Sequence, residues 1–177
     1  MEEKHKLFQF YKVEIFNKSG YLKWIFRRKY RYLFFYRLGY ILYRKNLIYK
    51  FLGILIDELI TKAFGPDIDL RAEIGIGLAV AHVKHSFTIR AEAIIGKNFQ
   101  ILQGVTIGIG KNSDSRGKII IGDNVEIGAN SVILGNIKIG NNVTIGATTF
   151  INKNIPDNSI VVCEKKIKIR SKTKNEG

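Results

Sequence analysis

Isoleucine recurs at every sixth position along the C-terminal half of the chain, at Ile121, Ile127, Ile133, Ile139, Ile145 and Ile151. A second register, two residues earlier, carries aliphatic or small β-compatible residues: Ile119, Val125, Ser131, Ile137, Val143 and Thr149. A period of six matches neither the roughly 3.6 residues of an α-helical turn nor the two-residue alternation of a flat strand. It is typical of a solenoid whose coils consist of short, repeated strands.

Each six-residue unit predicts one side of a triangular coil. The isoleucine points inward and stacks on its copies in neighbouring coils, and the residue two places earlier packs beside it. Gly and Asn tolerate left-handed backbone angles and mark the corners, as at Gly122, Asn124, Gly128 and Asn130. Three sides close a coil of about eighteen residues. Several coils are needed because each one buries its apolar side chains only against its neighbours.

The same period extends upstream, with interruptions. Two further runs have it, the second three residues out of step with the first: Ile89, Ile95, Ile101 and Ile107, and Ile68, Ile74 and Val80. Between Ile107 and Ile121 the count breaks, and the polar stretch 109–118 is predicted to be a loop outside the coil, where function often resides. We therefore expect a β-helical domain over residues 66–163 and a basic C-terminal tail over 164–177.

The N-terminal segment, residues 1–65, has a different composition. Residues 1–66 hold 14 Lys and Arg against five Asp and Glu, 16 of the 19 Phe and Tyr, and the only Trp. Apolar residues recur there at helical spacing and no proline precedes Pro66, so two or three helices are expected. One interpretation is an interfacial surface, with aromatic rings at headgroup depth and cations on anionic lipid. The other is that the aromatic rings cap the solenoid and leave a solvated basic face.

Charge and cysteine content narrow the class of protein. The formal net charge is +14, but no nucleic-acid-binding motif accompanies it, so we expect no nucleic-acid partner. Cys163 is the single cysteine, which excludes an intramolecular disulfide. No run reaches the roughly 18 apolar residues of a spanning helix, and the first residues lack the apolar core of a signal peptide. We expect a cytoplasmic protein, peripheral at the inner membrane under the interfacial interpretation.

Two of the three histidines, His82 and His85, lie near the start of the predicted solenoid. A histidine can accept a proton near neutral pH, as a general base must. The alternative for either residue is an exposed side chain without a chemical role. For Asp67, beside Pro66, the alternative is a solvated carboxylate at a corner. No His, Cys or Asp cluster has ligand spacing, so no metal is expected.

The stretch from Asp67 to Lys166 resembles the catalytic half of the serine acetyltransferase group of hexapeptide-repeat acyltransferases. Asp67 and His82 reproduce the fifteen-residue spacing of that family's Asp–His dyad, and residues 103–108, Gln-Gly-Val-Thr-Ile-Gly, resemble its Q-G/S-V-T-L-G motif. Residues 128–140 match its second strong block. The resemblance implies an all-β left-handed parallel β-helix with an N-terminal α-helical segment, a homotrimer, and acetyl-CoA as co-substrate.

The resemblance also implies roles for individual residues. His82 would take the proton of the acceptor hydroxyl, and Asp67 would orient the imidazole. Residues at the repeat corners and in the tail would bind acetyl-CoA: Gly108, Gly110, Ala129, Ala147, Lys165 and Lys166. Arg116 of the loop is a candidate for acceptor binding, and so is His85, although His85 matches no catalytic position of the family. The two lysines have a solvated tail as their alternative.

Departures from the family bear on the acceptor. The Asp that precedes the family's catalytic His is Ala81 here, and its D-R-H-P-K-I loop reads Asp-Ser-Arg-Gly-Lys-Ile at 114–119, without a histidine. The helical segment is also shorter. In these respects the chain looks more like small exopolysaccharide O-acetyltransferases of the colanic-acid type. We therefore expect a sugar hydroxyl of a surface-polysaccharide precursor, free or lipid-linked, as acceptor. A serine O-acetyltransferase variant and a non-catalytic trimeric scaffold are the alternatives.

Overall fold

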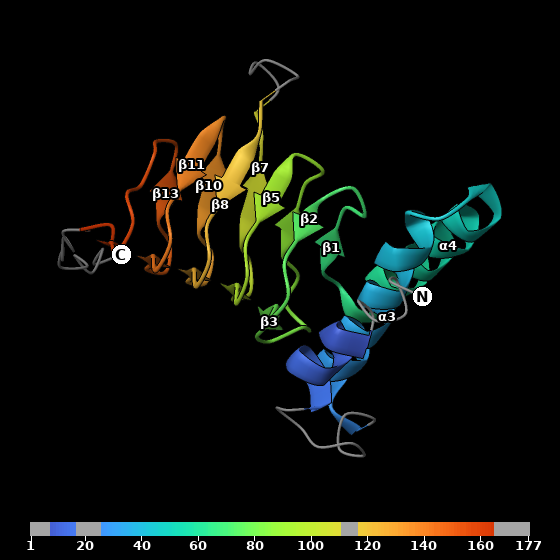
Figure 1. Cartoon of the computed structure of the whole chain (residues 1–177). Coiled ribbons are helices and arrows are strands. Elements are labelled where there is room, and N and C mark those ends of the chain that lie inside the picture. Colours follow the sequence, from blue (N-terminus) through green and yellow to red (C-terminus); the bar gives the residue numbers. More distant parts are fainter. Residues whose placement is uncertain (1–7, 17–25, 111–116, 165–177) are drawn as a thin grey trace, which may run out of the picture.

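The computed structural model describes residues 8–16, 26–110 and 117–164. It shows a solenoid of parallel strands with helices at its N-terminal end, next to the first coil (Figure 1). The described helices are η1 (Lys12–Phe16), a π-helix, α3 (Arg28–Tyr43) and α4 (Leu47–Phe64). The predicted N-terminal helical segment is therefore present, and its last helix ends three residues before the first strand.

The strands form three sheets, one for each side of the coil. Sheet A contains β1 (Asp67–Ile68), β4 (Thr88–Ile89), β7 (Thr106–Gly108), β10 (Val132–Leu134) and β13 (Phe150–Ile151). Sheet B contains β2 (Glu73–Ile74), β5 (Ala93–Ile95), β8 (Ile119–Ile121) and β11 (Ile137–Ile139). Sheet C contains β3 (Ala79–Val80), β6 (Gln100–Ile101), β9 (Glu126–Ile127), β12 (Thr144–Ile145) and β14 (Ile160–Val161). From β1 to β10 each strand pairs in parallel with the strand three places later, so one coil takes one strand from each sheet; in the last coil an isolated bridge from Ile139 to Ile155 replaces the strand of sheet B, and β12 pairs with β14.

The register explains both interruptions of the sequence period. Ile119 pairs with Ile137, one eighteen-residue coil later. Asp67 pairs with Thr88, so the first coil carries three extra residues, and these fall between β3 and β4. Thr106 pairs with Val132, so a later coil carries eight extra residues. They fall between the end of β7 and the start of β8, where the loop was predicted.

The core of the solenoid is the predicted isoleucine column. The six isoleucines from Ile121 to Ile151 are at most 3% exposed. Asparagines at the corners adopt left-handed angles, with φ of 56° at Asn124 and 54° at Asn142. The Asn124 side-chain amide donates to Asn142 Oδ1 at 3.1 Å, so the corner residues also form a ladder between coils. Burial of the isoleucines and pairing of the corners both favour the regular stack.

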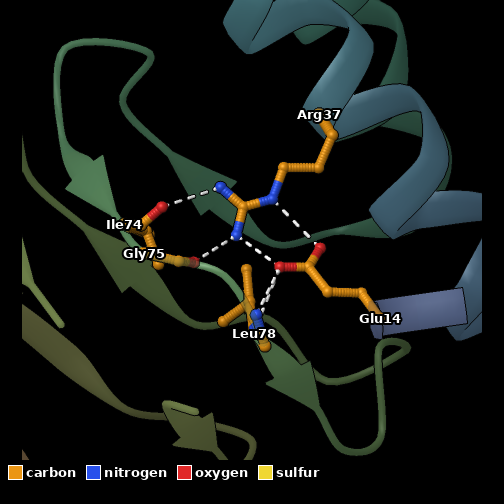
Figure 2. A network of polar contacts seen from close by, with 6 residues as sticks. Glu14, Arg37, Ile74, Gly75 and Leu78 are labelled. Atoms are coloured by element: carbon orange, nitrogen blue, oxygen red, sulfur yellow. Dashed lines mark hydrogen bonds and ion pairs between the residues drawn. The ribbon is translucent and has the colours of Figure 1, made fainter. Parts of the chain in front are cut away.

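The helices pack on the first coil through an aromatic face of α3. Tyr30, Tyr32, Leu33 and Tyr36 are all buried. Figure 2 shows the polar contact at the centre of this interface, where the Arg37 guanidinium of α3 meets the Glu14 carboxylate of η1. Arg37 also donates to the carbonyl oxygen of Ile74 at 2.9 Å. Glu14 accepts from the backbone N–H of Leu78 at 3.0 Å, which fixes η1, α3 and the first coil to one another.

Candidate active site

His82 lies immediately beyond β3, at the edge of the solenoid where sheet C turns into sheet A. Its φ is 54°, in the left-handed region that non-glycine residues seldom adopt. The N–H of His85 donates to the carbonyl of His82 at 2.9 Å, which closes a tight turn. Both imidazoles are exposed. The three extra residues of the first coil therefore project His82 and His85 together from this edge.

Asp67 lies on the same edge of the first coil. It opens β1, and its N–H donates to the carbonyl of Phe87, the last residue before β4, at 2.9 Å. The Asp67 carboxylate and the His82 imidazole are both described, and no hydrogen bond or ion pair joins them in this part of the chain. The structure thus places the two residues at one end of one edge. Their action as a dyad stays a prediction.

The His82 turn is fastened on both sides. The Ser86 hydroxyl donates to the carbonyl of Gly65, the residue after α4, at 2.7 Å. The N–H of Gly104, in the next coil, donates to the carbonyl of Ser86 at 2.7 Å. The turn is therefore linked to the end of α4 and to the coil beneath, so its position depends on how the helices dock.

The residues predicted to bind acetyl-CoA fall into two groups. Counting forward from the Ala79–Gln100 pair puts His82 level with Gln103 of the next coil, and counting back from the Thr88–Thr106 pair puts His85 there, because the three extra residues of the turn lie between the two counts. Hydrogen bonds between successive corners continue this line to Ala129 and Ala147, since the N–H of Asn130 donates to Gln103 at 2.9 Å and that of Thr148 to Ala129 at 2.8 Å. We call His82, Gln103, Ala129 and Ala147 the edge column. At about 4.8 Å per coil it is roughly 14 Å long.

Gly108 and Gly110 lie elsewhere, at the opposite edge of sheet A. Gly108 ends β7 and its carbonyl accepts from the N–H of Gly135 at 3.2 Å. A Cβ at Gly108 would come within 2.9 Å of Arg90 Cγ, whereas one at Gly110 would meet open space. Within a single chain these glycines are separated from the edge column by the width of sheet A. The remaining predicted residues, Arg116, Lys165 and Lys166, lie outside the described residues.

Gln103 is a further candidate site residue, which the sequence indicated only as part of a motif. Its side-chain oxygen Oε1 is buried and has no hydrogen-bond partner among the described residues. Leaving such an acceptor unpaired costs about 1–3 kcal/mol. An orphaned acceptor within a line of small residues suits an elongated ligand that carries amide N–H groups, and the pantetheine arm of CoA is such a ligand. The edge column therefore fits the co-substrate that the resemblance implies.

A pocket of about 260 Å³ opens beside the residue that precedes His82. Ala81 and Gln100 line it from sheet C, and Lys29 and Tyr30 line it from α3. Because Ala81 carries no polar group, the polarity of this pocket comes from the helical segment and from Gln100. Its position next to His82 makes it a candidate for acceptor binding.

Asp57 of α4 is a further carboxylate at this end of the molecule. Burial raises the pKa of Asp57, and the negative charges of Asp67 and Asp69 act in the same direction, so that the pKa is about 6. In the sequence Asp57 reads only as an interruption of an apolar run. Asp57 lies four residues after the buried Gly53 and three before the buried Ile60, on the buried side of α4. Among the described residues, no group of three or more His, Cys, Asp or Glu side chains is arranged to hold a metal ion.

Parts of the sequence match a known protein family and a known protein. The family described as bacterial transferase hexapeptide (six repeats) matches residues 118–153. Serine acetyltransferase 1, chloroplastic, of Arabidopsis thaliana is 38% identical over 82 residues, which are 46% of this chain and 25% of that protein.

Two solved structures are similar over nearly the whole chain. Serine acetyltransferase isoform 3 of Entamoeba histolytica, in complex with cysteine, has 29% identity and a TM-score of 0.73, over 97% of this chain and 60% of that one. The serine acetyltransferase of Neisseria gonorrhoeae, in complex with serine, has 30% identity and a TM-score of 0.73, over 92% and 67%.

These solved structures bear on the handedness of the β-helix and on how much of each relative the chain spans. Mirror-image coils do not superpose, and serine acetyltransferases have a left-handed β-helix, so the expected left-handed fold is supported by the match. The chain spans a quarter of the Arabidopsis protein and 60% of the Entamoeba structure. The comparisons support the resemblance to serine acetyltransferases, and the resemblance to the colanic-acid type stays a prediction.

Proposed function

The chain belongs to the bacterial hexapeptide-repeat transferases, and from this premise we propose that it is an acetyl-CoA-dependent O-acetyltransferase of the serine acetyltransferase type. The observation that carries the proposal is the position of His82. It heads the edge column, so a base that projects from the coil lies in line with residues suited to the pantetheine arm.

The chemistry assigned to His82 is general-base catalysis. A hydroxyl has a high pKa and attacks a thioester poorly unless its proton is removed as the new bond forms. The neutral His82 imidazole takes that proton while the hydroxyl oxygen bonds to the acetyl carbon. When the carbon–sulfur bond breaks, the imidazolium returns the proton to the CoA thiolate. Asp67 orients the imidazole and stabilises its charged form.

Serine is the acceptor that the comparisons favour. The proteins reported above are named serine acetyltransferases, and one of them was solved with serine bound. Lys29 and Gln100 line the pocket beside Ala81 and offer hydrogen-bond donors for a carboxylate. The proposal therefore takes serine as the first acceptor.

A sugar hydroxyl is the second candidate, and Ala81 is the observation that favours it. Where serine acetyltransferases carry an Asp before the catalytic His, this chain has an apolar methyl group, which leaves the amino group of serine without that carboxylate. The 260 Å³ pocket lies just below the roughly 300–1,000 Å³ typical of small-molecule sites. It offers donors and acceptors from several elements, as a polyhydroxylated ring needs.

Acceptor profiling separates these functions. Thiol release from acetyl-CoA is measured with L-serine and with a panel of free and nucleotide-linked sugars, using wild type and Ala81→Asp. Release stimulated by serine, and increased in Ala81→Asp, identifies a serine enzyme. Release stimulated by a sugar and lowered in Ala81→Asp identifies a sugar enzyme. If no acceptor stimulates release above hydrolysis, the acetyltransferase proposal is wrong and the scaffold alternative holds.

A further inference from the structure

The exposed face of α4 is unlike the rest of the described surface. Seven large apolar side chains on it are 45–79% exposed: Leu47, Ile48, Phe51, Leu52, Ile54, Leu55 and Leu59. We call these residues the α4 apolar face. We propose that this face docks on a membrane surface of anionic phospholipid. No described helix is both long and apolar enough to cross a bilayer, so the contact proposed is one in which α4 lies along the surface.

The sequence left two interpretations of the aromatic and apolar residues, namely capping of the solenoid and contact with lipid, and α3 fits the first while α4 fits the second. Three tyrosines of α3 are buried, namely Tyr30, Tyr32 and Tyr36, and Tyr32 packs edge-on against Phe87 of the first coil, so they cap the solenoid rather than meet lipid. Phe35 is exposed at 39%, and it lies with Leu59 beside a nearly apolar groove between the helices. The surface available to lipid is thus the outer side of α4, extended by Phe35.

The width of the α4 apolar face fits the apolar interior of a lipid bilayer better than it fits a single partner helix. Successive residues of a helix are about 100° apart, so residues 47, 48, 51, 52, 54 and 55 together span an arc of about 160°, nearly half of the helix circumference. A partner helix would cover only a narrow seam of positions three and four residues apart. In the first turns of α4 this arc has no Asp or Glu, and the ion pair Glu58–Lys62, at 2.9 Å, begins only towards the C-terminal end.

Charge selects an anionic partner and disfavours a second copy. Residues 26–66 contain nine Lys and Arg against two Asp and Glu. Lys45 and Lys50 flank the N-terminal end of the α4 apolar face, with Lys50 Nζ 5.0 Å from the centre of the Tyr43 ring. Two copies packed through α4 would bring these like charges together. An anionic bilayer pairs with them, at about 1 kcal/mol for each basic residue near the surface, and accepts the apolar side chains.

The docked orientation has a consequence for the site, and this step rests on the proposed function. The Ser86 hydroxyl bonds to the carbonyl of Gly65, so the His82 turn is attached to the end of α4. A protein lying on α4 therefore holds the catalytic edge next to the lipid surface. That placement suits an acceptor carried on a lipid, and it puts the protein at the cytoplasmic leaflet, where anionic lipids are enriched.

Vesicle sedimentation tests the docking without any substrate. The full chain is mixed with vesicles of phosphatidylcholine alone or with phosphatidylglycerol added, at low and high salt. We expect sedimentation with the anionic vesicles that weakens as salt rises. The double variant Phe51→Gln and Leu55→Gln should bind about tenfold or more weakly, since each change removes a large apolar contact. The matched control, Ile160→Gln and Val162→Gln, changes two apolar side chains that are 80% and 63% exposed at the other end of the solenoid, and should bind as wild type.

Several results would overturn the docking. These are a protein that stays in the supernatant with anionic vesicles at low salt, or equal sedimentation of the α4 variant and wild type. Light scattering adds a third result. If wild type does not bind vesicles and the α4 variant has a smaller molar mass than wild type, the α4 apolar face joins copies of the chain instead. Since no acetyl-CoA is present, failure here leaves the acetyltransferase proposal untouched, and its own failure would show only in thiol release.

Discussion

Arg37 and Glu14 form a buried ion pair that joins the helical segment to the first coil. The Arg37 Nε donates to a Glu14 carboxylate oxygen at 3.0 Å, and the two side chains are 0% and 1% exposed. Backbone groups of the coil complete the pairing on both sides, with Ile74 accepting from Arg37 and Leu78 donating to Glu14. Every charge in the contact is therefore matched, which is the condition under which a buried pair is tolerated.

Removing one partner of this pair should be costly. Arg37→Leu leaves the Glu14 carboxylate buried without its counter-charge, and we expect the free energy of unfolding to fall by about 3–5 kcal/mol. Arg71→Leu is the matched control, because Arg71 pairs with Asp69 at 2.7 Å but is 61% exposed. Its loss should lower the free energy of unfolding by about 1 kcal/mol or less. Chemical denaturation of both variants measures the difference, and equal losses would contradict the structural role of the buried pair.

Asp57 should make stability depend on pH. Its pKa is raised from 3.8 to about 6 in the folded protein, first by burial and then by Asp67 and Asp69. The folded state therefore binds this proton more tightly than the unfolded state, so stability falls as the pH rises from about 4 to about 6. Asp57→Asn removes this fall and should be more stable than wild type above pH 6. Thermal unfolding across pH 4–8 checks this, with Glu58→Gln as the exposed control. An Asp57→Asn variant with the wild-type pH profile would show that another group titrates.

The assembly should be a trimer with sites between chains. In one chain Gly108 and Gly110 lie across sheet A from the edge column, so the residues assigned to acetyl-CoA converge only when a second chain supplies one group. A closed ring of three head-to-tail interfaces satisfies this for every chain. Light scattering should give three times the 20.2 kDa mass of the chain. A monomer with full activity would contradict the shared site.

The solenoid could be predicted closely because its pattern is local and repeated. Each isoleucine of the column occupies an equivalent place, and a change of phase such as that between Val80 and Ile89 translates directly into a longer coil. The helices were harder to interpret because α3 and α4 are both rich in apolar residues. Which face is buried depends on contacts with the first coil, such as those of Arg37, that no periodicity reveals.

The site was predictable in part, and for a related reason. Motif spacing singled out His82 as a candidate base, and the strand register puts the turn that carries it in line with Ala129 and Ala147, two residues that the family resemblance had assigned to acetyl-CoA. Asp57 and the pocket beside Ala81 were not found, since both arise where the helices meet the coil. Contacts between distant segments are set by docking and leave little trace in local composition.

The most direct test of the central claim is the turnover of His82→Ala. Thiol release from acetyl-CoA is followed with the acceptor that gives the highest wild-type rate, and Lys84→Ala, an exposed change in the same turn, is the control. Loss of a general base should lower kcat by about 10²–10⁴-fold, while the control keeps wild-type turnover. A His82→Ala protein that is folded and retains wild-type kcat would contradict the assignment of His82 as the catalytic base.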